Sequence, residues 1–341
     1  MKILSIGELL MRLTVPDNLR FAQAEQFRLD VGGSEANVAM TLSQLGWGAR
    51  MLSALPDNDL GDRICRELSR CQVDISHIGR MGKRVGIYFL EEGNSLRSSR
   101  IIYDRADSAV NELSPEDVNW ESVFQGVTHL HWSAITPALS QNAADICQEA
   151  VDRASELGVT VSCDLHFRKN LWAYGKEPGQ IIPALLEKSS IVLGDPSTIQ
   201  ALTGIEMESR KLGSIERVSQ LTPDYRKLMD RFTGVKCVSM LLRTVHSANH
   251  HELKSVMVTN DHEYESSSID VDNMKERIGG GDAYMAGLLF GLEHHEDRQK
   301  SIEFALTLSA LKHTILGDYF RGNLQDVERV MNSNQQGKII R

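Results

Sequence analysis

Hydrophobic positions in the second half of the chain alternate between two periodicities. Short apolar runs, typical of strands, follow stretches in which apolar residues recur every three or four positions. We predict strands over 127–133, 159–165, 191–193 and 235–242, and helices over 140–157, 180–188 and 196–203. Strands joined by helices pair in parallel, so this order predicts a parallel sheet with helices on both faces. A further strand is expected at 2–7.

Two other segments, 9–29 and 85–103, alternate polar and apolar residues as half-buried strands do. A helical section separates them, which suggests a small sheet set apart from the main body. We therefore expect one domain over 1–341, with a lid formed by about 9–30 and 84–104. The polar segment 209–224 is predicted to be an irregular surface segment.

Glycines precede two of the expected helices. Gly32 and Gly33 come before a helix that Ser34 is expected to cap. Three glycines at 279–281 lead into Asp282, where backbone can approach a ligand closely and a helix N-terminus can hold an anion. Asp282 is then placed to take a proton from an attacking hydroxyl. The alternatives are a tight strand-to-helix turn at the first pair and a plain helix cap at Asp282.

Composition and charge narrow the class of protein. Of 341 residues, 41% are hydrophobic and 24% charged, which is usual for a globular protein. A net charge of −9 argues against nucleic acid or an anionic membrane as the main partner. No apolar run approaches 18 residues, and the five cysteines form no C-x-x-C pair. We expect a cytoplasmic protein with reduced thiols.

Six segments together carry a family resemblance. They read GELLMRL at 7–13, GGSEANVA at 32–39, GIYFLE at 86–91, YDRA at 103–106, SAITPALS at 133–140 and KHTILGD at 312–318. With the glycines before Asp282, the chain resembles the PfkB/ribokinase family of sugar kinases, and within it the 2-keto-3-deoxygluconate kinases. The likeness spans nearly the whole chain in order.

The resemblance implies a ribokinase-like, Rossmann-like three-layer α/β sandwich with a β lid, and a dimer or larger homo-oligomer. It also implies ATP and Mg²⁺, with a monovalent cation as an option, and no assigned metal ligands. Asp282 would be the catalytic base, and Gly279, Gly280 and Gly281 the anion hole. The implied sugar contacts are Gly33, Asn37, Tyr88, Tyr103, Arg105, Ile135, Arg168 and Asp318. The implied nucleotide contacts are Arg168, the same three glycines and Ser309.

Elementary chemistry agrees with a sugar-acid substrate. A carboxylate calls for a planar, permanently charged partner, and Arg105 and Arg168 each supply charge-assisted bonds of about 1.5–3 kcal/mol. Sugar hydroxyls suit the phenol groups of Tyr88 and Tyr103. The resemblance therefore implies phosphorylation of the terminal hydroxyl of 2-keto-3-deoxygluconate, and this chemistry agrees with it.

Three segments depart from the family pattern: the first two changes remove polar groups near the nucleotide and Mg²⁺, and the third keeps the charge. The metal-linked N-x-x-E motif falls at 195–198, which reads DPST, and the usual T-L-R reads LLR at 241–243. The acid six residues before the base is Glu276 instead of Asp. Two alternatives follow: a weakly active or inactive relative that binds a sugar acid as a sensor, and a kinase for another sugar.

Overall fold

The central sheet decides the architecture. The computed structural model describes residues 1–212 and 215–332, and within them ten strands form one sheet in the order β13-β12-β11-β10-β9-β8-β1-β4-β5, with β14 beside β12. Its strands are β1 (Lys2–Ile6), β4 (Gly48–Leu55), β5 (Val73–Arg80), β8 (His129–Ser133), β9 (Thr160–Asp164), β10 (Ile191–Leu193), β11 (Cys237–Ser247), β12 (His250–Thr259), β13 (Glu263–Glu265) and β14 (Ile269–Val271).

Pairing is parallel from β5 through to β11, and β12 adds an antiparallel edge to it. Successive residues of β1 show that the sheet is covered on both faces. Ile3 packs into the core on one face of the sheet and Leu4 into the core on the other, so this strand is buried on both faces. Such strands need helices on each side.

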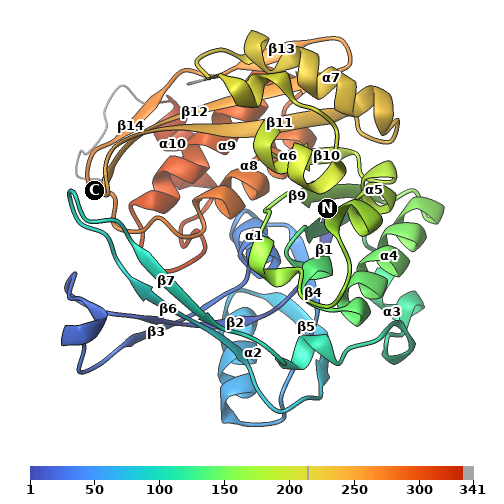
Figure 1. Cartoon of the computed structure of the whole chain (residues 1–341), viewed down its shortest axis with the longest axis vertical. Helices are drawn as coiled ribbons and strands as arrows, with labels where there is room; N and C mark the ends of the chain where they lie inside the picture. The colour runs from blue at the N-terminus through green and yellow to red at the C-terminus, as the bar shows by residue number, and fades with distance from the viewer. Residues whose placement is uncertain (213–214, 333–341) are drawn as a thin grey trace.

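Two layers of helices cover the sheet (Figure 1). One layer holds α1 (Ser34–Gln44), α2 (Asp59–Arg70), α8 (Gly280–His294), α9 (Arg298–His313) and α10 (Leu324–Asn332). The other holds α3 (Trp120–Phe124), α4 (Gln141–Glu156), α5 (Pro178–Glu187), α6 (Pro196–Thr203) and α7 (Thr222–Arg231). The predicted three-layer α/β sandwich is confirmed, and each predicted strand and helix appears within a few residues of its expected bounds.

A second, four-stranded sheet stands beside the main body, in blue and cyan in Figure 1. Its order is β3-β2-β6-β7, built from β2 (Leu10–Thr14), β3 (Arg28–Gly32), β6 (Gly86–Glu91) and β7 (Arg100–Asp104). The two excursions expected from alternation supply all four strands. Their role as a lid, and a single domain over 1–341, stay predictions.

Two local predictions were wrong. Ser34 does not cap α1: Gly33 holds that position at a φ of 135°, and Ser34 is the first helical residue. The 209–224 segment, described except for 213–214, is not simply an irregular surface, because Ser209 and Asp224 are buried and α7 begins within it. The Asp224 carboxylate accepts hydrogen bonds from the backbone of Glu208 and Ser209, which draws the segment inward.

The five cysteines are free and buried, in line with the reduced thiols predicted above. Across residues 1–212 and 215–332, every helix is too short or too polar to cross a membrane.

Candidate active site

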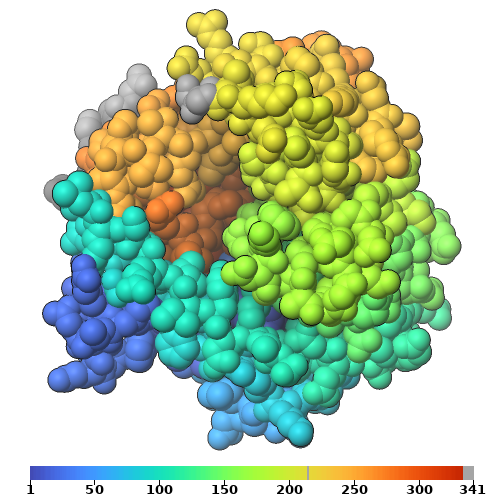
Figure 2. Space-filling model, viewed as in Figure 1, coloured from blue at the N-terminus to red at the C-terminus, as the bar shows by residue number. Residues whose placement is uncertain are grey.

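The candidate site lies where the carboxyl ends of the parallel strands meet the start of α8. Figure 2 shows a hollow on this face, with orange-red C-terminal residues at its floor and cyan residues of the four-stranded sheet along one edge. In open parallel sheets this is the position at which ligands bind. The residues predicted from sequence can be placed around it.

The three glycines before Asp282 have different structural reasons. Gly279 has a φ of +78°, and a Cβ there would lie 1.6 Å from the carbonyl oxygen of Asp318. A Cβ on Gly280 would lie 2.3 Å from the ring of His313. At Gly281 a Cβ would make ordinary van der Waals contact with the His166 ring at 3.5 Å, and this glycine lines a cavity. Packing therefore requires the first two glycines, while the third borders the cleft.

Asp282 is held in place by two side chains of α1. Its carboxylate accepts hydrogen bonds from Ser34 Oγ and from Asn37 Nδ2, each at 2.7 Å. Burial raises the pKa of Asp282 above the ordinary value, although the nearby His166 and the two hydrogen bonds oppose that rise. The Oδ1 atom of Asn37 has no hydrogen-bond partner among the described residues. A sugar hydroxyl can supply one.

An unpredicted ion pair stands next to Asp282. His166 Nε2 lies 2.9 Å from Asp164 Oδ2, just past the end of β9, and its side chain is 27% exposed. Its other ring nitrogen, Nδ1, lies 3.4 Å from Ser34 Oγ. The polar atoms of Asp164, His166 and Asp282 all lie within 4.8 Å of one another. The sequence analysis predicted a strand over 159–165 and gave His166 no role.

Arg105 already has a carboxylate partner within the chain. Its Nε donates to Glu8 Oε2 at 2.7 Å, its Nη2 also contacts that oxygen, and the hydroxyl of Ser108 binds the other oxygen of Glu8. Arg105 is 9% exposed, so a second carboxylate would have to share the guanidinium with Glu8. Tyr103, in contrast, is 48% exposed, with the Arg105 guanidinium 5.7 Å from its ring centre.

Asp318 and Tyr88 belong to a buried charged cluster. The Tyr88 hydroxyl donates to Asp318 Oδ2, and Arg12 Nη1 lies 2.7 Å from Asp318 Oδ1. Burial raises the pKa of Asp318 to about 6 even though Arg12 opposes the shift. Both residues were predicted to contact the sugar, and in this structure the polar groups of both are paired with other residues of the protein.

Three further predicted residues differ in exposure. Ile135 is half-buried at the start of a short 3₁₀ turn, and Arg168 is exposed, with Nη1 donating to the Phe167 carbonyl. Ser309, predicted to contact nucleotide, is 0% exposed and donates to the Gly280 carbonyl at 2.8 Å. Ser309 therefore supports the glycine loop from behind. At Gly33 a Cβ would lie 2.3 Å from the Glu8 carbonyl oxygen.

Comparison of the chain with known proteins identifies its family. Residues 1–228 match the model of the pfkB family of carbohydrate kinases. The chain belongs to this family. The prediction of a phosphotransferase acting on a sugar hydroxyl is confirmed at that level.

Individual relatives of this pfkB kinase are similar over nearly their full lengths. A 2-dehydro-3-deoxygluconokinase structure from Thermotoga maritima superposes with a TM-score of 0.92 at 34% identity, covering 98% of this chain and 100% of that one. A pfkB carbohydrate kinase structure from Listeria grayi gives 0.88 at 29% identity, with 96% and 98% covered. The 2-dehydro-3-deoxygalactonokinase of Haloferax volcanii is 27% identical, with 98% of each chain covered.

In this pfkB kinase a cavity of about 350 Å³ adjoins Gly281. Arg168, Arg243, Asp195, Thr198 and Gly281 are among its lining residues. Asp195 does not offer a free carboxylate: Oδ1 accepts from the N–H groups of residues 197 and 198, and Oδ2 from the Thr198 hydroxyl. Segment 195–198 therefore caps α6 and does not fit a Mg²⁺-binding role.

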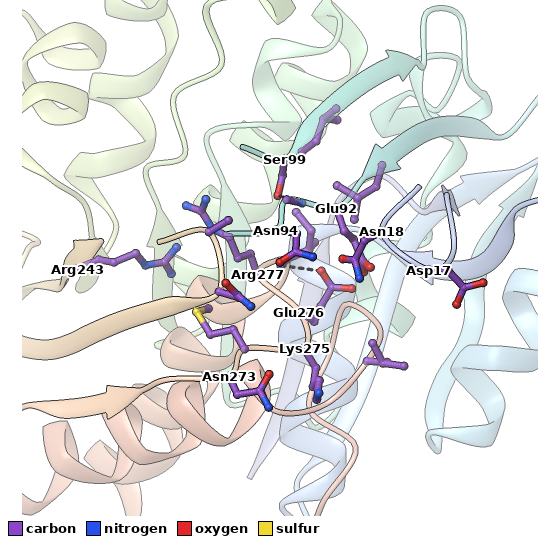
Figure 3. Close-up of a pocket in the computed structure, with 18 residues that line it drawn as sticks. Asp17, Asn18, Glu92, Asn94, Ser99, Arg243, Asn273, Lys275, Glu276 and Arg277 are labelled. Atoms are coloured by element: carbon purple, nitrogen blue, oxygen red, sulfur yellow. Dashed lines mark hydrogen bonds between the residues drawn. The ribbon is translucent and has the colours of Figure 1, made fainter. Parts of the chain in front are cut away.

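Arg243 of this pfkB kinase also borders a larger cavity of about 610 Å³ on the other side of the loop before α8. In Figure 3 it enters from β11, while Glu276 and Arg277 enter from that loop. Burial and the neighbouring Arg277 lower the pKa of Arg243 to about 10. No carboxylate lies within ion-pair distance of Arg243 among the described residues, and its one side-chain contact is to His313 at 3.4 Å. This cation is suited to an anionic ligand.

Proposed function

We propose that this protein transfers the γ-phosphoryl group of ATP to the terminal hydroxyl of 2-keto-3-deoxygluconate, giving 2-keto-3-deoxy-6-phosphogluconate. The observation that carries the proposal is the buried Asp282 at the start of α8, directly after a glycine loop that borders an open cleft. The sugar-acid class is supported by the names of the Thermotoga and Haloferax relatives. The sugar-acid carboxylate would be met by the exposed Arg168 or shared at Arg105.

The transfer follows from the positions of three groups. Asp282 accepts the proton of the sugar hydroxyl, whose oxygen forms the new bond to phosphorus. The bond from phosphorus to the β–γ bridging oxygen breaks, and its electron pair leaves with ADP. Backbone N–H groups at 279–281 and the helix dipole stabilise the charge on the transferring group. General-base help of this kind is typically worth about 10²–10⁴-fold in rate.

Two arginines are proposed to hold the nucleotide phosphates. Arg243 has no carboxylate within ion-pair distance in the described chain, and Arg168 is exposed on the same cavity. Each can add a charge-assisted hydrogen bond to a phosphate oxygen. We propose that Mg²⁺ enters with ATP and is bound mainly by phosphates and water, which is its usual habit at kinase sites.

Exposed apolar residues and the free cysteines bear on oligomeric state and compartment. The lid exposes Phe27, Ile101, Ile102 and Tyr103, an apolar surface that a second copy of the chain can cover. We propose a homo-oligomer, a dimer or larger. Five free cysteines favour the reducing cytoplasm.

An ADP-release assay with ATP and Mg²⁺ tests the reaction. We expect turnover with 2-keto-3-deoxygluconate and little with fructose or ribose, and a loss of about 10²–10⁴-fold in kcat in Asp282→Asn. The galactonate epimer belongs in the same panel, because the Haloferax relative carries that name. Full turnover by Asp282→Asn would overturn the assignment of the base.

A sugar-acid-binding protein without turnover is the second candidate. It is favoured by one observation, the use of Asp195 and Thr198 for helix capping where the family pattern has a metal-linked pair. It predicts that 2-keto-3-deoxygluconate raises Tm while ATP does not bind. Measurable nucleotide affinity together with ADP release excludes it.

A further inference from the structure

The ion pair beside Asp282 carries an inference that rests on the proposed function. Four side chains form a line: Asp164 to His166 at 2.9 Å, His166 to Ser34 at 3.4 Å, and Ser34 to Asp282 at 2.7 Å. They come from the end of β9, the first turn of α1 and the first turn of α8. Phosphoryl transfer as described above uses only the last of the four.

Donor counting and charge together indicate where the protons in this line lie. A serine hydroxyl has one hydrogen, and Ser34 gives its hydrogen to Asp282 Oδ1. Ser34 Oγ can then only accept at the longer contact, which places a hydrogen on Nδ1 of His166. Nε2 lies 2.9 Å from Asp164 Oδ2, an oxygen that has no hydrogen-bond partner among the described residues, and the charge of this carboxylate favours a proton on Nε2 as well. A ring protonated on both nitrogens is the imidazolium cation.

The charges that face His166 agree with this state. Burial alone would lower the pKa of His166, but the carboxylates of Asp164 and Asp282 outweigh it and the pKa is raised. The positive charge of Arg168 acts in the opposite direction. In return, the His166 charge lowers the pKa of Asp282, against the upward effect of its burial.

We propose that Asp164, His166 and Ser34 form a relay that keeps Asp282 ionised and oriented toward the sugar hydroxyl. Asp164 holds the imidazolium, and the imidazolium fixes Ser34 as an acceptor, so the serine hydrogen can point only at Asp282. His166 is a positioning residue in this arrangement, since it acts on the reaction through Ser34. The logic is that of a base oriented by a second and a third group.

The pH dependence of kcat/KM tests the relay, because its acid limb reports the base of the free enzyme. In His166→Asn the neutral side chain no longer favours ionised Asp282, so we expect the acid limb to move up by about one pH unit. On the acid side of the profile, kcat/KM of His166→Asn should then be lowered about tenfold more than it is near neutrality. Ser34→Ala should move the limb in the same direction. His262→Asn, on an exposed turn, is the matched control and should leave the profile unchanged.

A second measurement is independent of turnover. Nitrogen-15 NMR of the wild-type protein without substrate reads the protonation of His166 directly, and Asp164→Asn should lower the pKa of that ring. If no sugar acid is phosphorylated, the proposed function fails while this titration still decides the relay. Three results overturn the relay: a His166→Asn profile that superimposes on wild type after scaling, a ring already neutral near pH 6, or tight Zn²⁺ binding by nucleotide-free protein that His166→Asn abolishes.

Discussion

Arg12 offers a stringent test of how the four-stranded sheet is joined to the main body. It lies on β2 of that sheet, its side chain is 0% exposed, and its guanidinium contacts carboxylates from both parts. Asp30 of the four-stranded sheet lies at 3.0 Å, and Glu276 and Asp318 of the main body lie at 2.8 and 2.7 Å. Replacing Arg12 by Met preserves much of the volume and removes the charge.

The magnitude follows from what the substitution leaves behind. Breaking a buried ion pair by removing one partner costs about 3–5 kcal/mol, because the other charge stays buried without compensation. Burial already raises the pKa of Asp318 to about 6, and Arg12 restrains that rise, so Arg12→Met raises it further. A carboxyl with a raised folded-state pKa destabilises the fold once pH exceeds the unfolded value. The deficit should therefore be small near pH 4 and should grow as the pH rises from about 6 through 8.

Urea unfolding at acid and neutral-to-alkaline pH measures this deficit. Arg28→Met is the matched control: Arg28 also contacts Asp30, at 3.0 Å, and Glu276, at 3.7 Å, but its side chain is 32% exposed. A partly exposed pair contributes about 0–1 kcal/mol. If Arg12→Met loses no more stability than Arg28→Met near pH 8, or loses the same amount at both pH values, the account of the cluster is refuted.

Four shorter predictions complete the set. Gly279→Ala forces a Cβ onto the Asp318 carbonyl at a φ of +78°, so we expect a lower Tm by calorimetry and a loss of kcat. Arg243→Leu should raise KM for ATP by about tenfold or more in steady-state kinetics, as loss of a charge-assisted bond implies. Because burial raises the pKa of Asp282, wild-type kcat/KM should fall on acidification at a higher pH than an ordinary carboxyl would give. Asp195→Ala should cost about 1 kcal/mol in urea unfolding through loss of the α6 cap.

The fold could be predicted from the sequence because its signals are local. A strand buried on both faces is a short apolar run, and a helix that covers a sheet has its own period, so β8 to β11 and α4 to α6 were found within a few residues. Lid strands follow from alternation for the same reason. The N-cap of α1 was misplaced by one residue, because a glycine at a φ of 135° and a serine both suit a helix start.

Much of the candidate site could not be predicted, because its contacts join residues far apart in the chain. Ser34 and Asp282 are separated by 248 positions, Ser34 and His166 by 132, and Arg105 and Glu8 by 97. A single sequence gives no measure of such distances. Arg105 was predicted to bind a substrate carboxylate. Its partner in the structure is Glu8, and the sequence analysis used the segment containing Glu8 only as evidence of the family resemblance.

The departures on the nucleotide side have structural explanations that the sequence did not suggest. Asp195 became the cap of α6, and Glu276 became one of the carboxylates that hold Arg12. The residues that replace the family pattern at positions 195 and 276 therefore contribute to the stability of the fold. Under the proposed function, positive charge near the transferring phosphoryl group would come from Arg243, which has no carboxylate partner in the described chain, and from His166 beside Gly281. Phosphoryl transfer depends mainly on positioning and charge neutralisation. An altered motif therefore does not by itself argue for lost activity, and this is why ADP release and nucleotide binding have to be measured together.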